Sequence, residues 1–444
     1  MHHTFDPFDG SDIHPARLGI PRNLIGILRT PGLVAAQLSE PSTILAVWVV
    51  GGLYTLLGSV CFTELGTMLP KAGGYYVYAR RAFGDTVGFA VGWTDWLTYC
   101  AVLGYVSIAI GEFSAVLFPS LAGAVKAIAI ATLVSLVLLQ WAGLRVSSRF
   151  QEATTALKFV AFLILIVACL AYSASASPAP GPATVALGSS STFVGLVVAL
   201  QSVLITYGGW QSALYFTEED RNPDLNLPRS MIGGVVSVIG VYLLVNIALL
   251  SVLSVPDLAH STLPAADAAQ RILGGRGGQI ITVLSLISLP PLLNAIMMIG
   301  TRILFAMGRD RLLWARTAAV NAGGTPGIAT LVTTAVAVAL IGSGTFQKLV
   351  AMASFFLAAN YCICCLALVV LRRREPELAR PFRAWGYPWS AGIVLLGAAA
   401  FLIGVLAGDT RTAVGALVLA AAGLAGRSVV RWRAAVVASP AIRA

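Results

Sequence analysis

The chain has 444 residues, of which 57% are hydrophobic and 11% are charged. A soluble globular protein carries about 25% charged residues, so this composition excludes an ordinary soluble enzyme or binding domain and predicts an all-α integral membrane protein. A formal net charge of +10 can indicate a nucleic acid partner, so the distribution of the charge along the chain matters.

The N-terminal part of the chain is unlike the rest. Residues 1–23 are polar and cannot cross hydrocarbon, and the apolar segment 24–38 is interrupted by Arg29 and Pro31. It is therefore at most half a span, because about 20 apolar residues are needed to cross a bilayer. Full spans are predicted after it at 43–63, 86–116, 124–143, 152–172, 193–217, 230–253, 278–307, 327–344, 347–371, 387–407 and 412–431. Pro290-Pro291 is expected to kink or open the span that contains it.

The loops on alternate sides of these spans differ in positive charge. If the pair Arg80-Arg81 lies inside, most of the 29 Lys and Arg residues fall on that same side. This asymmetry follows the positive-inside rule. It predicts a multi-pass protein of the cell inner membrane with a cytoplasmic C-terminus, with membrane lipid and no nucleic acid as a partner. The predicted domains are the polar segment 1–23, a core at 24–372, two further spans at 373–433 and a cytoplasmic tail at 434–444.

The sixth span contains the most informative stretch. Tyr207-Gly208-Gly209-Trp210 interrupts an apolar helical run, and a glycine costs about 1 kcal/mol in a helix interior relative to alanine. The pair therefore marks a point where the backbone opens, which a membrane tolerates only inside protein or beside a cavity. Transporters build substrate sites at such breaks. The alternative is that the two glycines let neighbouring helices pack closely.

Five segments together resemble bacterial amino acid permeases. They are GILRTPG (26–32), FTELGTMLPKAGGYYVYARRAFG (62–84), YGGWQSALYFTEEDRNPDLNLPRS (207–230), LLNAIMMIGTRILFAMGRDRLL (292–313) and FRAWGYPW (382–389). The chain resembles the amino acid–polyamine–organocation (APC) superfamily, with the L-type amino acid transporter branch closest. The resemblance implies a LeuT-type fold, a 5+5 inverted repeat plus two C-terminal spans, in which the half-span at 24–38 corresponds to the broken sixth span. The polar segment 1–23 stands where the family has an apolar half-helix, so the first span is expected to be incomplete.

The resemblance also implies a substrate site. Backbone N–H groups at the first motif would bind the substrate carboxylate, in keeping with the anion preference of helix N-termini, and carbonyls before the Gly pair would bind the ammonium group. The third and eighth spans would line the pocket. The residues implied are Gly26, Ile27 and Leu28; Leu204, Ile205, Tyr207, Gly208 and Gly209; Thr98, Tyr99 and Val102; and Asn294.

Several ionisable residues fall within or beside the spans. Lys158 lies where some proton-coupled relatives replace a sodium ion with a lysine, so we expect it to carry or gate the proton; the alternative is that it snorkels to the headgroups. Asp95 could pair with a neighbouring cation, although the spacing names none, and a water-facing position is an equal expectation. Glu112 is expected near the outer surface. The acids that end the second and sixth spans are expected to be solvated, or else to form gate ion pairs with Arg80, Arg81 or Arg221; these acids are Glu64, Glu218, Glu219 and Asp220.

These features together predict a secondary active transporter of amino acids. Neutral amino acids are favoured because the implied pocket positions are uncharged, and the transport mode is proton symport or exchange. The six cysteines fall within predicted spans and lack zinc-site spacing, so no cofactor or metal is expected. The alternatives are a non-transporting scaffold or sensor derived from a permease, and a polytopic membrane enzyme, for which no catalytic constellation is visible.

Overall fold

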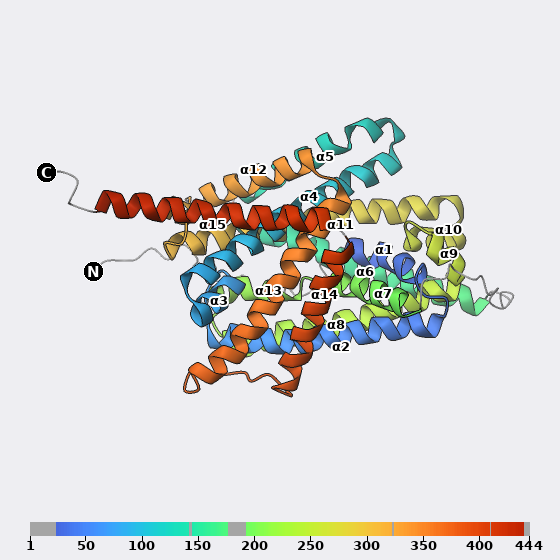
Figure 1. The fold of residues 1–444 in the computed structure, drawn as a ribbon. Coiled ribbons are helices and arrows are strands. Elements are labelled where there is room, and N and C mark those ends of the chain that lie inside the picture. Colours follow the sequence, from blue (N-terminus) through green and yellow to red (C-terminus); the bar gives the residue numbers. More distant parts are fainter. Residues whose placement is uncertain (1–23, 142–143, 176–191, 322–323, 409, 439–444) are drawn as a thin grey trace.

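The structure is a computed structural model that describes residues 24–141, 144–175, 192–321, 324–408 and 410–438. These residues form long helices joined by short helical segments and turns, with no strand among them (Figure 1). The all-α class is confirmed.

The principal elements are α1 (Leu24–Ala35), α2 (Pro41–Met68), α3 (Tyr75–Phe83), α4 (Asp85–Leu117), η2 (Pro119–Ala124), α5 (Val125–Trp141), α6 (Leu144–Ser175), α7 (Thr192–Tyr207), η3 (Trp210–Glu219), α8 (Pro223–Val252), α9 (Val255–His260), α10 (Pro264–Leu273), α11 (Gly277–Arg309), α12 (Gly327–Ser343), α13 (Phe346–Arg374), α14 (Trp389–Gly408) and α15 (Thr410–Ala438). The η segments are 3-10 helices, and two more of these, η4 (Gly274–Arg276) and η5 (Ala315–Ala318), lie in loops.

Each predicted span falls on one of these helices, except that the span 193–217 covers both α7 and η3. Among the described residues, eight helices are long and apolar enough to cross a membrane by length and composition, and Phe159–Ala174 and Gly327–Ser343 are shorter apolar stretches. The half-span corresponds to α1, which begins at Leu24 and has 12 residues. Of the two expectations for Pro290-Pro291, a kink or an opening of the span, the opening is excluded, because α11 is one helix through both prolines. Neighbouring helices make such prolines tolerable within a membrane helix.

The helices pack in matched pairs. α1 lies against α7, α2 against α8, and α4 against α11, and the contact between α4 and α13 has its counterpart between α11 and α6. Each of the first three pairs joins helices that correspond to each other in the two predicted repeats. The last two contacts, α4 with α13 and α11 with α6, are equivalent to each other when the repeats are exchanged. This is the arrangement expected of a LeuT-type 5+5 inverted repeat. The two C-terminal helices, α14 and α15, pack against α13 and against each other.

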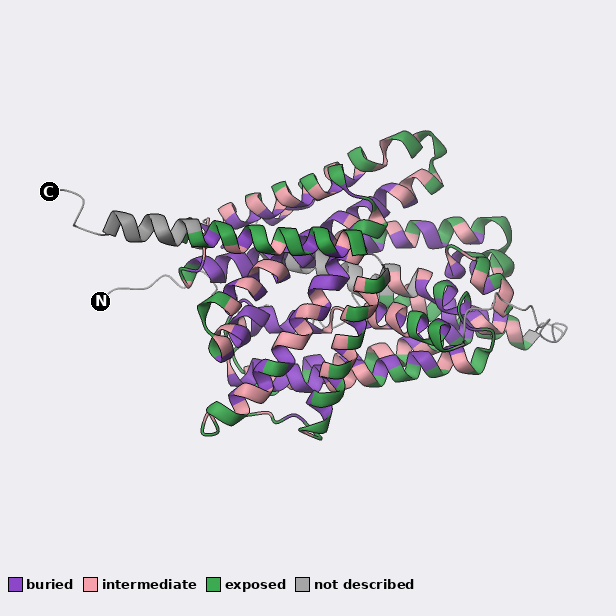
Figure 2. Cartoon of the chain, in the orientation of Figure 1, coloured by how far each residue is buried: buried purple, intermediate pink, exposed green. Residues whose placement is uncertain are grey.

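The outside of the bundle is apolar. Large hydrophobic side chains such as Ile164, Phe193 and Leu396 are exposed, and exposed residues cover much of α14 and α15, whereas buried residues concentrate towards the interior of the bundle (Figure 2). Apolar surface on this scale on a helical protein marks the part that faces lipid.

Candidate functional site

The sixth span is broken at the predicted place. α7 ends at Tyr207, and the Gly208 N–H donates to the Ile205 carbonyl at 3.1 Å. Gly209 has φ of +111°, and its N–H donates to the Gln211 Oε1 at 3.0 Å. The chain continues as η3, a 3-10 helix of 10 residues. Since 3-10 runs are usually only 3–4 residues long and often mark hinges, the break is a built feature of the span.

The broken span lies directly beside α1. The hydroxyls of Thr30 and Thr206 are 2.6 Å apart, and both side chains are buried. Gly26, Ile27 and Leu28 lie in the first turns of α1, where the helix dipole favours anions. The side chains of Ile27 and Leu28 lie outside the described residues. The two motifs expected to bind the substrate backbone are thus carried by adjacent helices.

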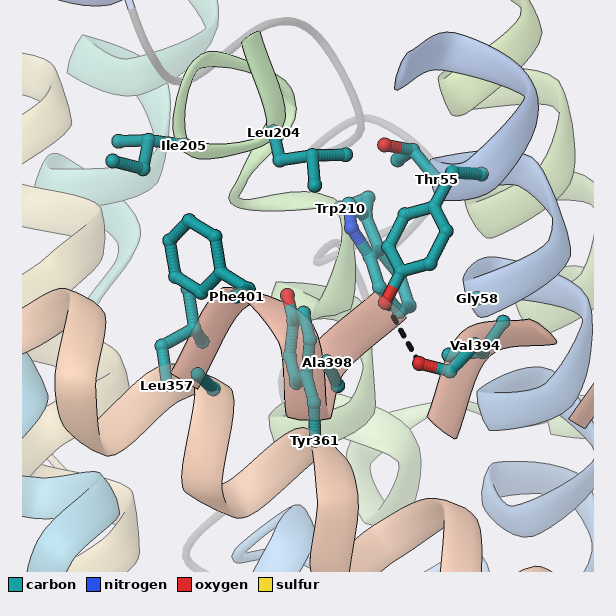
Figure 3. Close-up of a pocket in the computed structure, with 12 residues that line it drawn as sticks. Thr55, Gly58, Leu204, Ile205, Trp210, Leu357, Tyr361, Val394, Ala398 and Phe401 are labelled. Carbon is teal, nitrogen blue, oxygen red and sulfur yellow. Dashed lines mark hydrogen bonds between the residues drawn. The ribbon is translucent and has the colours of Figure 1, made fainter. Parts of the chain in front are cut away.

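A pocket lies next to the break (Figure 3). Of the predicted site residues, Leu204 and Ile205 line it. The complete lining is Tyr54, Thr55, Gly58, Leu204, Ile205, Trp210, Leu357, Ala358, Tyr361, Val394, Ala398 and Phe401. These residues come from α2, α7, η3, α13 and α14, and none of them is charged. The pocket therefore fits an apolar group.

The other predicted lining residues lie on different helices. Thr98 and Tyr99 are buried on α4, Val102 is half-buried there, and none of the three lines this pocket. Asn294 is fully buried on α11, where its backbone carbonyl and Oδ1 accept hydrogen bonds from the Gln140 Nε2 at 2.8 Å and 3.0 Å. The structure thus brings part of the predicted set to the pocket and leaves the α4 and α11 residues apart from it.

Aromatic residues that sequence reasoning missed close one side of the pocket. The Trp210 ring is 5.3 Å from Phe62 and 5.8 Å from Tyr361, measured between centroids. Figure 3 shows Trp210 and Tyr361 side by side. Phe62 also packs edge-on against Tyr75 at 5.4 Å. The position of Trp210 immediately after the Gly pair was a usable signal, whereas Phe62, Tyr75 and Tyr361 are far from it in sequence.

Beyond this aromatic layer lies one end of the helix bundle, which we call the arginine-rich end. Five ion pairs between elements that are distant in sequence define it. The pairs are Arg372–Glu64, Arg302–Glu219, Arg309–Glu218, Arg80–Asp310 and Arg81–Glu375, with N–O distances of 2.5–2.9 Å for the closest atoms. The hydrogen bond to Glu375 is the main reason why the pKa of Arg81 is raised.

The ion pairs correct the expectation of solvation for Glu64 and Glu219, whereas Glu218 is 40% exposed in its pair and Asp220 accepts hydrogen bonds from Asn222 and Asn226. The Glu64 side chain is 0% exposed and that of Glu219 is 9% exposed. Their partners, Arg372 and Arg302, belong to α13 and α11, and are not the arginines expected. No spacing rule links residues so far apart in the chain, so the partners could be found only in three dimensions.

The remaining ionisable residues have distinct settings. Lys158 belongs to α6, but its side chain lies outside the described residues. Glu112 is partly exposed and pairs with Arg29 at 3.3 Å. Asp95 is 1% exposed, and its Oδ2 accepts a hydrogen bond from the Tyr215 hydroxyl at 2.7 Å. A water-facing position for Asp95 is therefore wrong in this state.

Comparison with known proteins agrees with this architecture. The model of a family described as amino acid permease matches residues 22–423. The serine/threonine exchanger SteT of Bacillus subtilis is 28% identical over 404 residues, which cover 90% of this chain and 91% of SteT. The mouse b(0,+)-type amino acid transporter 1 is 28% identical over 85% of this chain and 78% of its own length. The mouse Asc-type amino acid transporter 1 is 28% identical over 81% and 69%.

Proposed function

The chain belongs to the amino acid permease family, and from this premise we propose that it is a secondary active transporter of neutral amino acids that works by proton symport or exchange. Its relatives are transporters and not enzymes, and the chain itself is a multi-pass membrane protein. The observation that carries the proposal is the break of the sixth span at Gly208-Gly209, beside both α1 and an uncharged pocket.

In this proposal the break holds the groups that all amino acids share. The N–H groups of Gly26, Ile27 and Leu28 at the start of α1 bind the carboxylate, where the positive end of the helix dipole lies. The carbonyls of Leu204, Ile205 and Tyr207, in the last turn of α7 before Gly208-Gly209, bind the ammonium group, with the Ile205 carbonyl also accepting from the Gly208 N–H. The contact between Thr30 and Thr206 supports this arrangement, because it holds the two motifs on adjacent helices.

The pocket supplies the reason for a neutral side chain. Its lining is uncharged and mostly apolar or aromatic, and a charged side chain placed there would lose hydration without a partner. We assign Thr98, Tyr99, Val102 and Asn294 to the α4 and α11 side of the substrate path, where they meet the substrate in a more open state.

We place the protein in the cell inner membrane with its C-terminus and arginine-rich end in the cytoplasm, as the distribution of Lys and Arg favours. The domain division remains the core 24–372, the spans in 373–433 and the tail 434–444, after the polar segment 1–23. Lys158 on α6 is the proposed coupling residue. Uptake that required a sodium gradient would contradict its role.

The test is uptake of labelled amino acids by proteoliposomes containing the purified full-length chain. The proposal expects saturable uptake of neutral amino acids that unlabelled neutral amino acids compete for and arginine or glutamate do not. Preloaded vesicles with the same amino acid inside test exchange. Absence of both uptake and exchange for all amino acids, with correctly folded protein, would favour the scaffold or sensor alternative instead.

A further inference from the structure

Asp95 is a buried carboxyl that the proposed substrate site does not use. It lies on α4, a membrane-spanning helix, and its side chain is 1% exposed. Within the described part of the chain, no Lys or Arg forms an ion pair with it. An ionised carboxylate without a cation is costly at this depth, and ionisable residues in spans are usually functional. The packing seen here therefore accommodates the protonated carboxyl.

The groups that face Asp95 are phenols and a thiol. They are Tyr215 of η3, whose hydroxyl donates to Asp95; Tyr99 of α4, whose ring packs on Tyr215; and Tyr75 of α3 and Tyr361 and Cys364 of α13, which interact with Asp95 electrostatically. Tyrosine and cysteine side chains are ordinarily uncharged at neutral pH. Asp95 is consequently the acidic group of this cluster that can release a proton when water reaches it.

None of the ion pairs formed by described residues on the other helices that pack against α4 includes Asp95. Arg302 of α11 pairs with Glu219, Arg427 of α15 lies over the Phe89 ring, and Lys126 of α5 donates to the Gly342 carbonyl. The segments α12 and η2 contain no ionisable residue. In the described part of the structure, Asp95 is therefore buried without a cation that neutralises its carboxylate.

The hydrogen bond of Asp95 joins it to the broken span. Tyr215 belongs to η3, which begins directly after Gly209, and its ring packs on Tyr99 at 5.4 Å and on Tyr75 at 5.9 Å. A Cβ built at Gly74 would lie 2.4 Å from the Tyr215 ring, so this ring is seated closely against the start of α3. Any movement of η3 away from α4 breaks the Asp95–Tyr215 bond and changes the surroundings of the carboxyl.

We propose that Asp95 is a proton-binding site that couples proton transfer to the movement of η3. This inference rests on the proposed transport function. With η3 seated on α4, the enclosed carboxyl holds a proton and the Tyr215 hydroxyl donates to it. When η3 moves away, water reaches the carboxyl, the O–H bond breaks and the proton passes to that water, leaving the carboxylate solvated. Release of this proton as η3 moves is the step that symport with the amino acid requires, in addition to the role proposed for Lys158 of α6.

The experiment compares two transport modes in proteoliposomes containing the full-length chain. The first is accumulation of a labelled neutral amino acid driven by an inward proton gradient. The second is exchange of labelled for unlabelled amino acid at equal pH on both sides. The variant is Asp95→Asn, which keeps the size of the side chain and cannot titrate. The matched control is Asp257→Asn, which removes a carboxyl from an exposed ion pair with Arg271 outside the spans.

The inference expects Asp95→Asn to lose the stimulation by the proton gradient and still to exchange amino acid, with Asp257→Asn behaving as the native chain. Retained stimulation in Asp95→Asn overturns the inference. Exchange by the native chain with no response to the gradient also overturns it, while the transport function stands. No exchange by the native chain refutes the transport function itself.

A second variant covers the case in which Asp95→Asn does not exchange. Tyr215→Phe keeps the ring packing and removes only the hydroxyl that donates to Asp95. The inference expects the pH dependence of its uptake to shift from that of the native chain. An unchanged pH profile would overturn the inference.

Discussion

The hydroxyls of Thr30 and Thr206 lie 2.6 Å apart, although 176 positions separate the two residues in the chain. The bond is buried and joins α1 to the last turn of α7, one residue before that helix ends. It therefore sets the spacing between the two segments that we propose hold the amino acid backbone.

Replacement of Thr30 by valine removes this bond while keeping the shape of the side chain. We expect Thr30→Val to lose about 1 kcal/mol of stability, the usual contribution of one hydrogen bond, and to weaken substrate affinity. Thr334→Val, which loses only a bond to the Thr330 carbonyl of its own helix, is the control. Thermal unfolding in detergent and the KM for uptake measure the two effects. A KM equal to that of the control would contradict the role given to this contact.

Gly209 has a backbone conformation that other residues rarely adopt, with φ of +111°. Gly209→Ala should strain the break by about 1–3 kcal/mol and lower transport, because η3 can no longer take the same course. Gly240→Ala lies in α8 with open space around the added methyl, and should be neutral or slightly stabilising. Unfolding temperature and uptake are measured for both. Equal behaviour of the two variants would show that the break tolerates a side chain.

The Arg302–Glu219 pair is enclosed, with the two side chains 5% and 9% exposed. Removal of one partner from a buried pair costs about 3–5 kcal/mol, so Arg302→Met should unfold at a clearly lower temperature. Arg271→Met breaks the exposed pair with Asp257 and should cost less than about 1 kcal/mol.

The double variant Arg302→Met with Glu219→Gln should recover much of the loss, because no buried charge is left unpaired. If Arg302→Met were no less stable than Arg271→Met, the pair would not hold α11 against η3 in solution.

Ala398 lines the pocket from α14. Ala398→Phe should fill part of it and raise the KM for large apolar amino acids by about tenfold, with little change for small ones such as alanine or serine. Leu396→Phe, at a position 73% exposed on the same helix, is the control. Competition by a series of neutral amino acids measures the effect. An equal loss for small and large substrates would mean that the pocket does not receive the side chain.

Local patterns predicted the helices and the break well. Uncharged runs of span length gave the positions of the helices, and the Gly208-Gly209 pair marked the place where α7 ends, because both signals depend on residues that are adjacent in the chain. Whether the prolines of α11 open their span could not be decided from sequence, since their effect depends on the neighbouring helices that pack around them.

Contacts between distant segments could not be predicted from the sequence. The pocket draws Tyr54, Tyr361 and Ala398 from three different helices, and no spacing relates them. The same holds for the Arg372–Glu64 pair and for the hydrogen bond between Tyr215 and Asp95. Burial reversed the expectation for Asp95, because one polar residue in an apolar helix does not reveal which neighbour it faces.

The most direct test of the transport site is a structure of the full-length chain with a bound neutral amino acid. We predict that its carboxylate lies at the N-terminus of α1 beside Gly26, Ile27 and Leu28, and its ammonium group at the carbonyls of Leu204, Ile205 and Tyr207. An amino acid bound away from both segments, or a sixth span that is continuous through Gly208-Gly209 in that complex, would contradict the account.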